Sequence, residues 1–138
     1  MNTTTVTPDT QPELIVKSVG IGHGDTPHGD VLLDLRPWFR NPYISPELRN
    51  LTGRDQDVIA SVLSAAGATE FVQHWFAAIR VLVGLGRGTV TVIVACAGGR
   101  HRSVVLADQL VYLARSAGLR AEVEHRDIDK PLLPPRAA

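Results

Sequence analysis

The segment from Cys96 to Ser103 has the composition of an anion-binding loop. It reads Cys-Ala-Gly-Gly-Arg-His-Arg-Ser and follows directly on an apolar run over 90–95. Backbone N–H groups in a glycine turn and in the first turn of a helix point the same way, and the helix dipole adds partial positive charge. Arg100 and Arg102 carry planar guanidinium groups, which suit phosphate or carboxylate. The expected binding residues of this loop are Gly98, Gly99, Arg100, His101, Arg102 and Ser103.

The same loop also fits the pattern C-x-x-G-x-x-R-S, a spacing used by cysteine-dependent phosphatases. In that chemistry Cys96 is the thiolate nucleophile, Arg102 holds the phosphate, and Asp55 or Asp57 is the general acid. Ala95 stands where these enzymes usually have histidine. A lone cysteine at a strand end is also most often a small buried residue. We therefore favour binding over catalysis and keep a Cys96-dependent phosphatase as the alternative.

His101 lies inside the loop, where an imidazole can bond a ligand or simply pack on the helix, and both interpretations stay open. No spacing of histidine, acidic residues and the single cysteine resembles a metal site, so we expect neither a metal nor a cofactor. The sequence contains no G-x-x-x-x-G-K-[ST] motif, so NTP hydrolysis of the common kind is not expected.

Composition predicts one globular domain in a reducing compartment. The 138 residues are 44% hydrophobic and 20% charged, which suits a packed core rather than disorder. The net charge of +0 gives no general basic field for nucleic acid. No apolar run reaches membrane-spanning length and the first residues lack a signal pattern, so we expect a soluble cytoplasmic protein.

The hydrophobic pattern predicts an α/β fold in a single domain, with a small, mostly parallel sheet of about four strands flanked by three helices. The expected strands cover 13–19, 31–36, 90–95 and 120–126. The expected helices cover 52–65, 69–83 and 101–117, with Thr52 and Thr69 as N-caps. The domain should extend over 13–130, between a disordered lead at 1–12 and a flexible proline-rich tail at 131–138.

Polar residues follow several of these strands. Ligands of parallel sheets bind beyond the carboxyl ends of the strands, where the 96–103 loop begins. Asp34 and Arg36 close one strand, and His125 and Arg126 close another. If the strands run parallel, these side chains converge on one edge of the sheet, and we expect Arg126 to be among the ligand-binding residues there.

Several separate segments together resemble the C-terminal domain of the RapZ family, bacterial proteins that join this domain to an N-terminal P-loop domain. The resemblance covers 18–127 in order and spacing. The matching segments are Ser18-Val19-Gly20-Ile21, Asp34-Leu35-Arg36, Asn41-Pro42, Pro46-Glu47-Leu48-Arg49, Leu51-Thr52-Gly53-Arg54-Asp55, Cys96 to Val104 and His125-Arg126-Asp127.

The resemblance implies a regulatory or sensor module that binds a phosphorylated small molecule, such as glucosamine-6-phosphate, and that forms homo-oligomers or binds a protein partner. It implies that Gly98, Gly99, His101, Arg102 and Ser103 hold the phosphate. Asp34 and Arg36 would line the same pocket, with Asn41 and Arg49 nearby.

Three departures limit what transfers. Nucleotide binding by the P-loop half is not carried over. Tyr43 replaces a histidine that follows Asn-Pro in the family. The basic tail linked to RNA binding is replaced by a proline-rich end, so an RNA-binding adaptor is the third and weakest alternative.

Overall fold

Four parallel strands make up the sheet in the part of the chain that the structure, a computed structural model, describes: residues 11–39 and 45–134. The strands are β1 (Leu14–Gly20), β2 (Val31–Asp34), β3 (Val90–Cys96) and β4 (Ala121–His125). Their order across the sheet is β2-β3-β1-β4, and every neighbouring pair is parallel. The predicted α/β class and parallel sheet are therefore confirmed.

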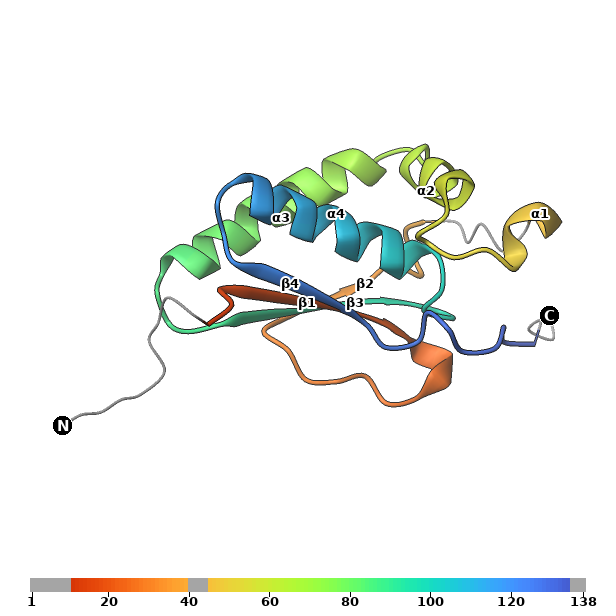
Figure 1. The fold of residues 1–138 in the computed structure, drawn as a ribbon, viewed down its shortest axis with the longest axis horizontal. Coiled ribbons are helices and arrows are strands. Elements are labelled where there is room, and N and C mark those ends of the chain that lie inside the picture. Colours follow the sequence, from red (N-terminus) through yellow and green to blue (C-terminus); the bar gives the residue numbers. More distant parts are fainter. Residues whose placement is uncertain (1–10, 40–44, 135–138) are drawn as a thin grey trace.

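Three longer helices cover one face of this sheet (Figure 1). They are α2 (Gln56–Leu63), α3 (Ala68–Gly84) and α4 (Arg102–Ser116). Two short elements were not predicted, the 3-10 helix η2 (Ile21–His23) and α1 (Pro46–Arg49). α1 begins on Pro46, whose fixed φ and missing N–H suit the first position of a helix.

The predicted N-caps of the two middle helices are wrong. α2 begins at Gln56, because Asp55 Oδ2 accepts the Thr52 N–H at 2.7 Å and closes a turn ahead of the helix. α3 begins at Ala68 instead of following Thr69, because Gly67 at φ +84° supplies a left-handed turn at its N-cap.

The central strand β3 is buried on both faces. Val92 and Val94 belong to the core that the helices cover, and neither is exposed to solvent. Ile93 faces the other way and packs with Val19 and Ile21, where the segment after β1 passes beneath the sheet (Figure 1). Burial of an aliphatic side chain contributes about 1.5–3 kcal/mol. This double burial agrees with the apolar composition that predicted a central strand.

The parallel register brings several polar or turn-forming residues to one edge of the sheet. Gly20 lies opposite Cys96, and Asp34 lies opposite Ala95. Ser18, two residues before the end of β1, lies opposite His125. The loop between β3 and α4 starts at this edge.

Candidate functional site

Arg102 is a deeply buried cation at the first position of α4. Only 4% of it is exposed. Its Nη1 donates to the Phe39 carbonyl at 2.8 Å, and its Nε has no hydrogen-bond partner in the described part of the chain. Burial lowers the pKa of Arg102, although the nearby Cys96 and Asp34 oppose that shift. Arginine stays protonated in proteins, so a positive charge is held here without an ion pair to any described carboxylate.

His101, directly before α4, is also buried, with 4% exposed. Its Nε2 has no hydrogen-bond partner among the described residues. Burial lowers the pKa of His101, so the imidazole is neutral near neutral pH. A neutral imidazole has one donor and one acceptor, so His101 can bond a ligand without adding charge.

Cys96 is the buried first residue of the loop, and its thiol contacts other residues of the loop. It ends β3 and is 2% exposed. The Gly99 N–H donates to Cys96 Sγ at 3.3 Å, and Sγ lies 3.2 Å from Ser103 Oγ. The thiol therefore joins the start of the loop to the first turn of α4.

The glycines of the loop pack directly on the end of β1. Gly99 has a φ of +70°, a conformation that side chains other than glycine rarely adopt. A Cβ at Gly99 would lie 2.5 Å from the Gly20 nitrogen, and one at Gly20 would lie 2.3 Å from the Gly98 carbonyl carbon. Backbone approaches backbone at this junction, and no side chain fits between them.

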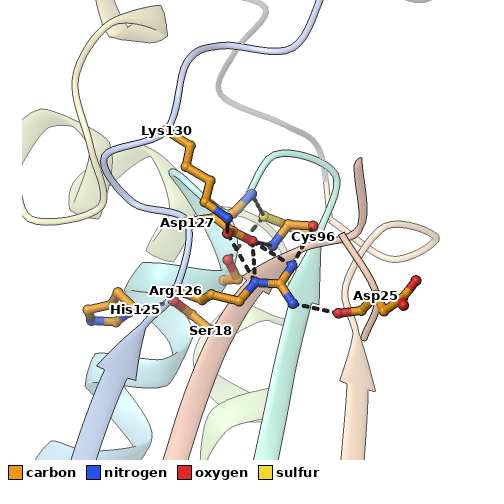
Figure 2. A network of polar contacts seen from close by, with 10 residues as sticks. Ser18, Asp25, Cys96, His125, Arg126, Asp127 and Lys130 are labelled. Atoms are coloured by element: carbon orange, nitrogen blue, oxygen red, sulfur yellow. Dashed lines mark hydrogen bonds and ion pairs between the residues drawn. The ribbon is translucent and has the colours of Figure 1, made fainter. Parts of the chain in front are cut away.

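Asp127 anchors the same junction, and the residue-by-residue reasoning on the sequence missed it. Its carboxylate is fully buried and accepts the Gly20 N–H at 2.7 Å (Figure 2). Arg126 Nη2 lies 2.8 Å from Asp127 Oδ2, and Lys130 Nζ lies 2.6 Å from Oδ1. Burial alone would raise the pKa of Asp127, but hydrogen bonds from Arg126, Lys130 and Gly20 outweigh it and hold the pKa at about 2. The signal in the sequence was an acidic residue directly after a strand and between two cations.

Two arginines predicted to bind ligand are held by backbone carbonyls in this structure. Arg100 donates to the carbonyls of Asn50 at 2.6 Å, Leu51 at 3.1 Å and Lys130 at 3.1 Å. Arg126 donates to the carbonyls of Gly20 and Asp25 besides its ion pair. Ligand binding by Arg100 and Arg126 stays a prediction.

The remaining predicted residues have the following contacts and positions. Asp34 and Arg36 form a partly exposed ion pair of 2.8 Å, and the hydrogen bond from Arg36 lowers the pKa of Asp34. Arg49 ends α1. Asn41 lies outside the described residues. Asp55, the general acid of the phosphatase alternative, uses its carboxylate to close the turn at Thr52.

A groove of about 540 Å³ lies on another part of the surface, between α4 and β4. Its lining includes Arg54, Asp108, Tyr112 and Arg115, and none of the residues of the 96–103 loop. Within residues 11–39 and 45–134 no cluster of three or more His, Cys, Asp or Glu side chains could hold a metal ion. None of the described helices has the length and apolar character needed to cross a membrane.

Comparison with known proteins assigns the family. The model of the RapZ C-terminal domain matches residues 12–129. This chain belongs to the RapZ C-terminal domain family.

Full-length relatives support the same assignment. A protein named as a nucleotide-binding protein from Thermobifida fusca is 38% identical over 119 residues, which cover 83% of this chain and 40% of that protein. Similarly named proteins from Heliobacterium modesticaldum and Clavibacter michiganensis are 36% and 37% identical, covering 87% and 88% of this chain and 41% and 43% of their own lengths. The chain thus spans about two fifths of the length of these relatives.

Proposed function

We propose that this RapZ C-terminal domain binds the phosphate group of a small cytoplasmic metabolite and acts as a sensor or regulatory module. The observation that carries the proposal is Arg102, a buried guanidinium whose Nε has no partner in the described chain. An unpaired buried charge is costly, and an oxyanion at this point would offset that cost.

The surroundings of Arg102 support an oxyanion rather than a structural counterion. Arg102 is the first residue of α4, and the N-terminus of a helix contributes partial positive charge and N–H groups that have no partner within the helix. His101, the residue directly before Arg102 in the chain, has a pKa lowered by burial, and its Nε2 has no hydrogen-bond partner among the described residues. An ester oxygen or hydroxyl of the ligand is a suitable partner for such a group.

The family resemblance adds a ligand class. Sugar phosphates, with glucosamine-6-phosphate as the first compound to test, combine a phosphate with polar ring substituents. Asp34 and Arg36, at the end of β2, are the residues we assign to the sugar side. Ligand binding would then be signalled by a change in self-association or in binding to a protein partner.

The test is a calorimetric titration of the protein with glucosamine-6-phosphate and with inorganic phosphate. Arg102→Ala should weaken both by ~1.5–3 kcal/mol, about tenfold or more, the usual scale for a hydrogen bond to a charged group. Arg102→Lys keeps the charge but removes the Nε donor, and should lose most of the same affinity. Arg80→Ala, an exposed arginine of α3, is the matched control. Equal affinity in wild type and both Arg102 variants would contradict the assignment.

A second function, a Cys96-dependent phosphatase, is favoured by one contact. Cys96 Sγ donates to Ser103 Oγ at 3.2 Å and accepts the Gly99 N–H at 3.3 Å. In the thiolate form, the Ser103 hydroxyl and the Gly99 N–H would both donate to the sulfur. Hydrolysis of para-nitrophenyl phosphate that disappears in Cys96→Ser would support this activity. A wild-type protein that leaves the ester intact while binding phosphate would leave only the sensor function.

A further inference from the structure

Four polar side chains form a hydrogen-bonded chain close to residues 96–103, which we call the anion loop. This chain takes no part in the contacts described above. His125 Nδ1 lies 2.6 Å from Ser18 Oγ, and His125 Nε2 lies 2.9 Å from Asp108 Oδ1. Arg54 donates to both Asp108 oxygens, from Nε at 2.8 Å and from Nη2 at 3.2 Å. The chain therefore leads from the buried Ser18 to Arg54, whose side chain is 56% exposed.

The direction of the hydrogen bonds follows from the charge of Asp108. Burial alone would raise the pKa of Asp108, but hydrogen bonds from His125 and Arg54 outweigh it and lower the pKa. An ionised carboxylate only accepts hydrogen bonds, so His125 Nε2 carries a proton. A neutral imidazole accepts the Ser18 hydroxyl proton at Nδ1, and a protonated imidazole donates from Nδ1 to Ser18 Oγ. Each side chain in the series then has a matched partner.

A Ser-His-Asp series suggests nucleophilic catalysis, but the burial of Ser18 argues against it. Ser18 is 0% exposed, and neither Ser18 nor His125 lines the groove beside Asp108. A serine nucleophile must reach its substrate, so this series does not act as a hydrolase centre here.

Three of the four members, Ser18, Asp108 and Arg54, belong to segments that touch the anion loop, and His125 joins Ser18 to Asp108. Ser18 lies two residues before Gly20, which packs on the loop glycines. Asp108 belongs to α4, and the last residues of the loop form the first turn of this helix. Arg54 follows Gly53, whose N–H donates to the Arg100 carbonyl at 2.8 Å. The chain thus ties together three walls of the loop: the end of β1, α4 and the 52–54 turn.

We propose that Ser18, His125, Asp108 and Arg54 are positioning residues that hold these three walls in the geometry required for anion binding. The inference rests on the proposed function, because it concerns the affinity of the same loop. None of the four touches the anion. Their effect passes through the position of Gly20, of Gly53 and of the first turn of α4.

The experiment measures the affinity for inorganic phosphate at one fixed pH, together with amide hydrogen exchange of residues 98–103. Asp108→Asn and Arg54→Ala should each weaken phosphate binding about threefold to tenfold, the scale of coupling through packed networks, and speed exchange in the loop. The double variant should lose little more than the stronger single variant, because both changes break one chain. His125→Gln and Ser18→Ala should act in the same direction.

Two variants separate positioning from general loss of structure. Asp108→Glu keeps the carboxylate and should recover most of the phosphate affinity that Asp108→Asn loses. Glu124→Gln changes an exposed residue next to His125 and should leave affinity and loop exchange unchanged. Thermal unfolding of each variant identifies any that fail to fold.

The outcomes distinguish this inference from the proposed function. If wild type binds phosphate and the Asp108 and Arg54 variants bind it equally well, the positioning role is wrong and the binding function stands. If Asp108→Glu binds as weakly as Asp108→Asn, the carboxylate is not the determinant and the positioning role is again wrong. If wild type itself binds no phosphate, both proposals fall together.

Discussion

Arg102, within the proposed anion loop, and Asp127, at the junction of that loop with β1, are both buried charged residues, but their surroundings differ. Asp127 accepts hydrogen bonds from Gly20, Arg126 and Lys130, so its charge is matched within the protein. Arg102 donates to one carbonyl and lies near Cys96, but its Nε has no partner among the described residues. A matched buried charge stabilises the fold, whereas an unmatched one favours binding of an external ion. We therefore assign structure to Asp127 and ligand binding to Arg102.

Asp127→Asn tests the structural assignment through the pH dependence of stability. The pKa of Asp127 lies at about 2, below its ordinary value of 3.8, so its contribution is complete above about pH 4 and is lost as the pH falls toward 2. At pH 6 the unfolding free energy of the wild type should be about 2 kcal/mol higher than that of Asp127→Asn. Urea denaturation at pH 6, 4, 3 and 2 should show that difference shrinking with acid.

Asp129→Asn provides the control for this measurement, because Asp129 is an exposed acid in the same segment. Its stability should follow that of wild type across the pH range. A difference between wild type and Asp127→Asn that stays constant from pH 6 to pH 2 would show that the ionised carboxylate is not the source of the stabilisation.

At the scale of elements, the junction between β1 and the loop before α4 decides the shape of the site. The junction depends on close backbone contact between Gly20 and the glycines at 98 and 99, and on the Asp127 carboxylate that receives the Gly20 N–H. The two loop glycines differ in what surrounds them. A Cβ at Gly99 meets backbone, whereas a Cβ at Gly98 meets nothing within 4 Å.

Gly99→Ala and Gly98→Ala are therefore a matched pair. Gly99→Ala combines a strained positive φ with a clash against the Gly20 backbone and should cost roughly 2–3 kcal/mol of unfolding free energy. Gly98→Ala should change stability by less than about 0.5 kcal/mol. Chemical denaturation of the two variants measures the contrast, and equal stabilities would show that the junction is not tightly packed.

At the scale of the whole molecule, Arg100 joins segments that lie far apart in the sequence. Its guanidinium donates to carbonyls at Asn50 and Leu51 on one side and at Lys130 on the other. It thereby connects the segment between α1 and α2 with the segment that follows β4. Both segments border the anion loop, so Arg100 contributes to the site by holding its surroundings together.

Arg100→Ala should loosen both segments at once, because each loses hydrogen bonds to the same side chain. We expect faster amide hydrogen exchange in residues 45–55 and 127–134, while β3 stays protected. Phosphate affinity should fall less than in Arg102→Ala. Arg36→Ala, which removes a partly exposed arginine paired with Asp34, should leave exchange in both segments unchanged. A variant with wild-type exchange and an affinity loss equal to that of Arg102→Ala would instead make Arg100 a direct ligand.

Local patterns in the sequence predicted much of the fold. Residues 90–95 are apolar apart from Thr91, which matches the doubly buried β3, and the periodic apolar positions after them predicted α4. The matching segments over 18–127 also indicated the family. Strands and helices bury apolar side chains at regular intervals, so the spacing of apolar residues in the sequence indicates which element forms. Helix starts were less predictable, since the turn at Thr52 depends on one Asp55 hydrogen bond.

The sequence by itself therefore determined the strands, the parallel α/β class and the position of the loop at 96–103, for which we propose anion binding. Only the tertiary structure decided which polar residues near that loop are free to bind. Arg100, Arg102 and Arg126 look alike in sequence, yet carbonyls at Asn50, Leu51 and Lys130 hold Arg100, and Asp127 pairs with Arg126. A guanidinium takes its role from partners contributed by distant segments, and those partners meet only when the chain folds.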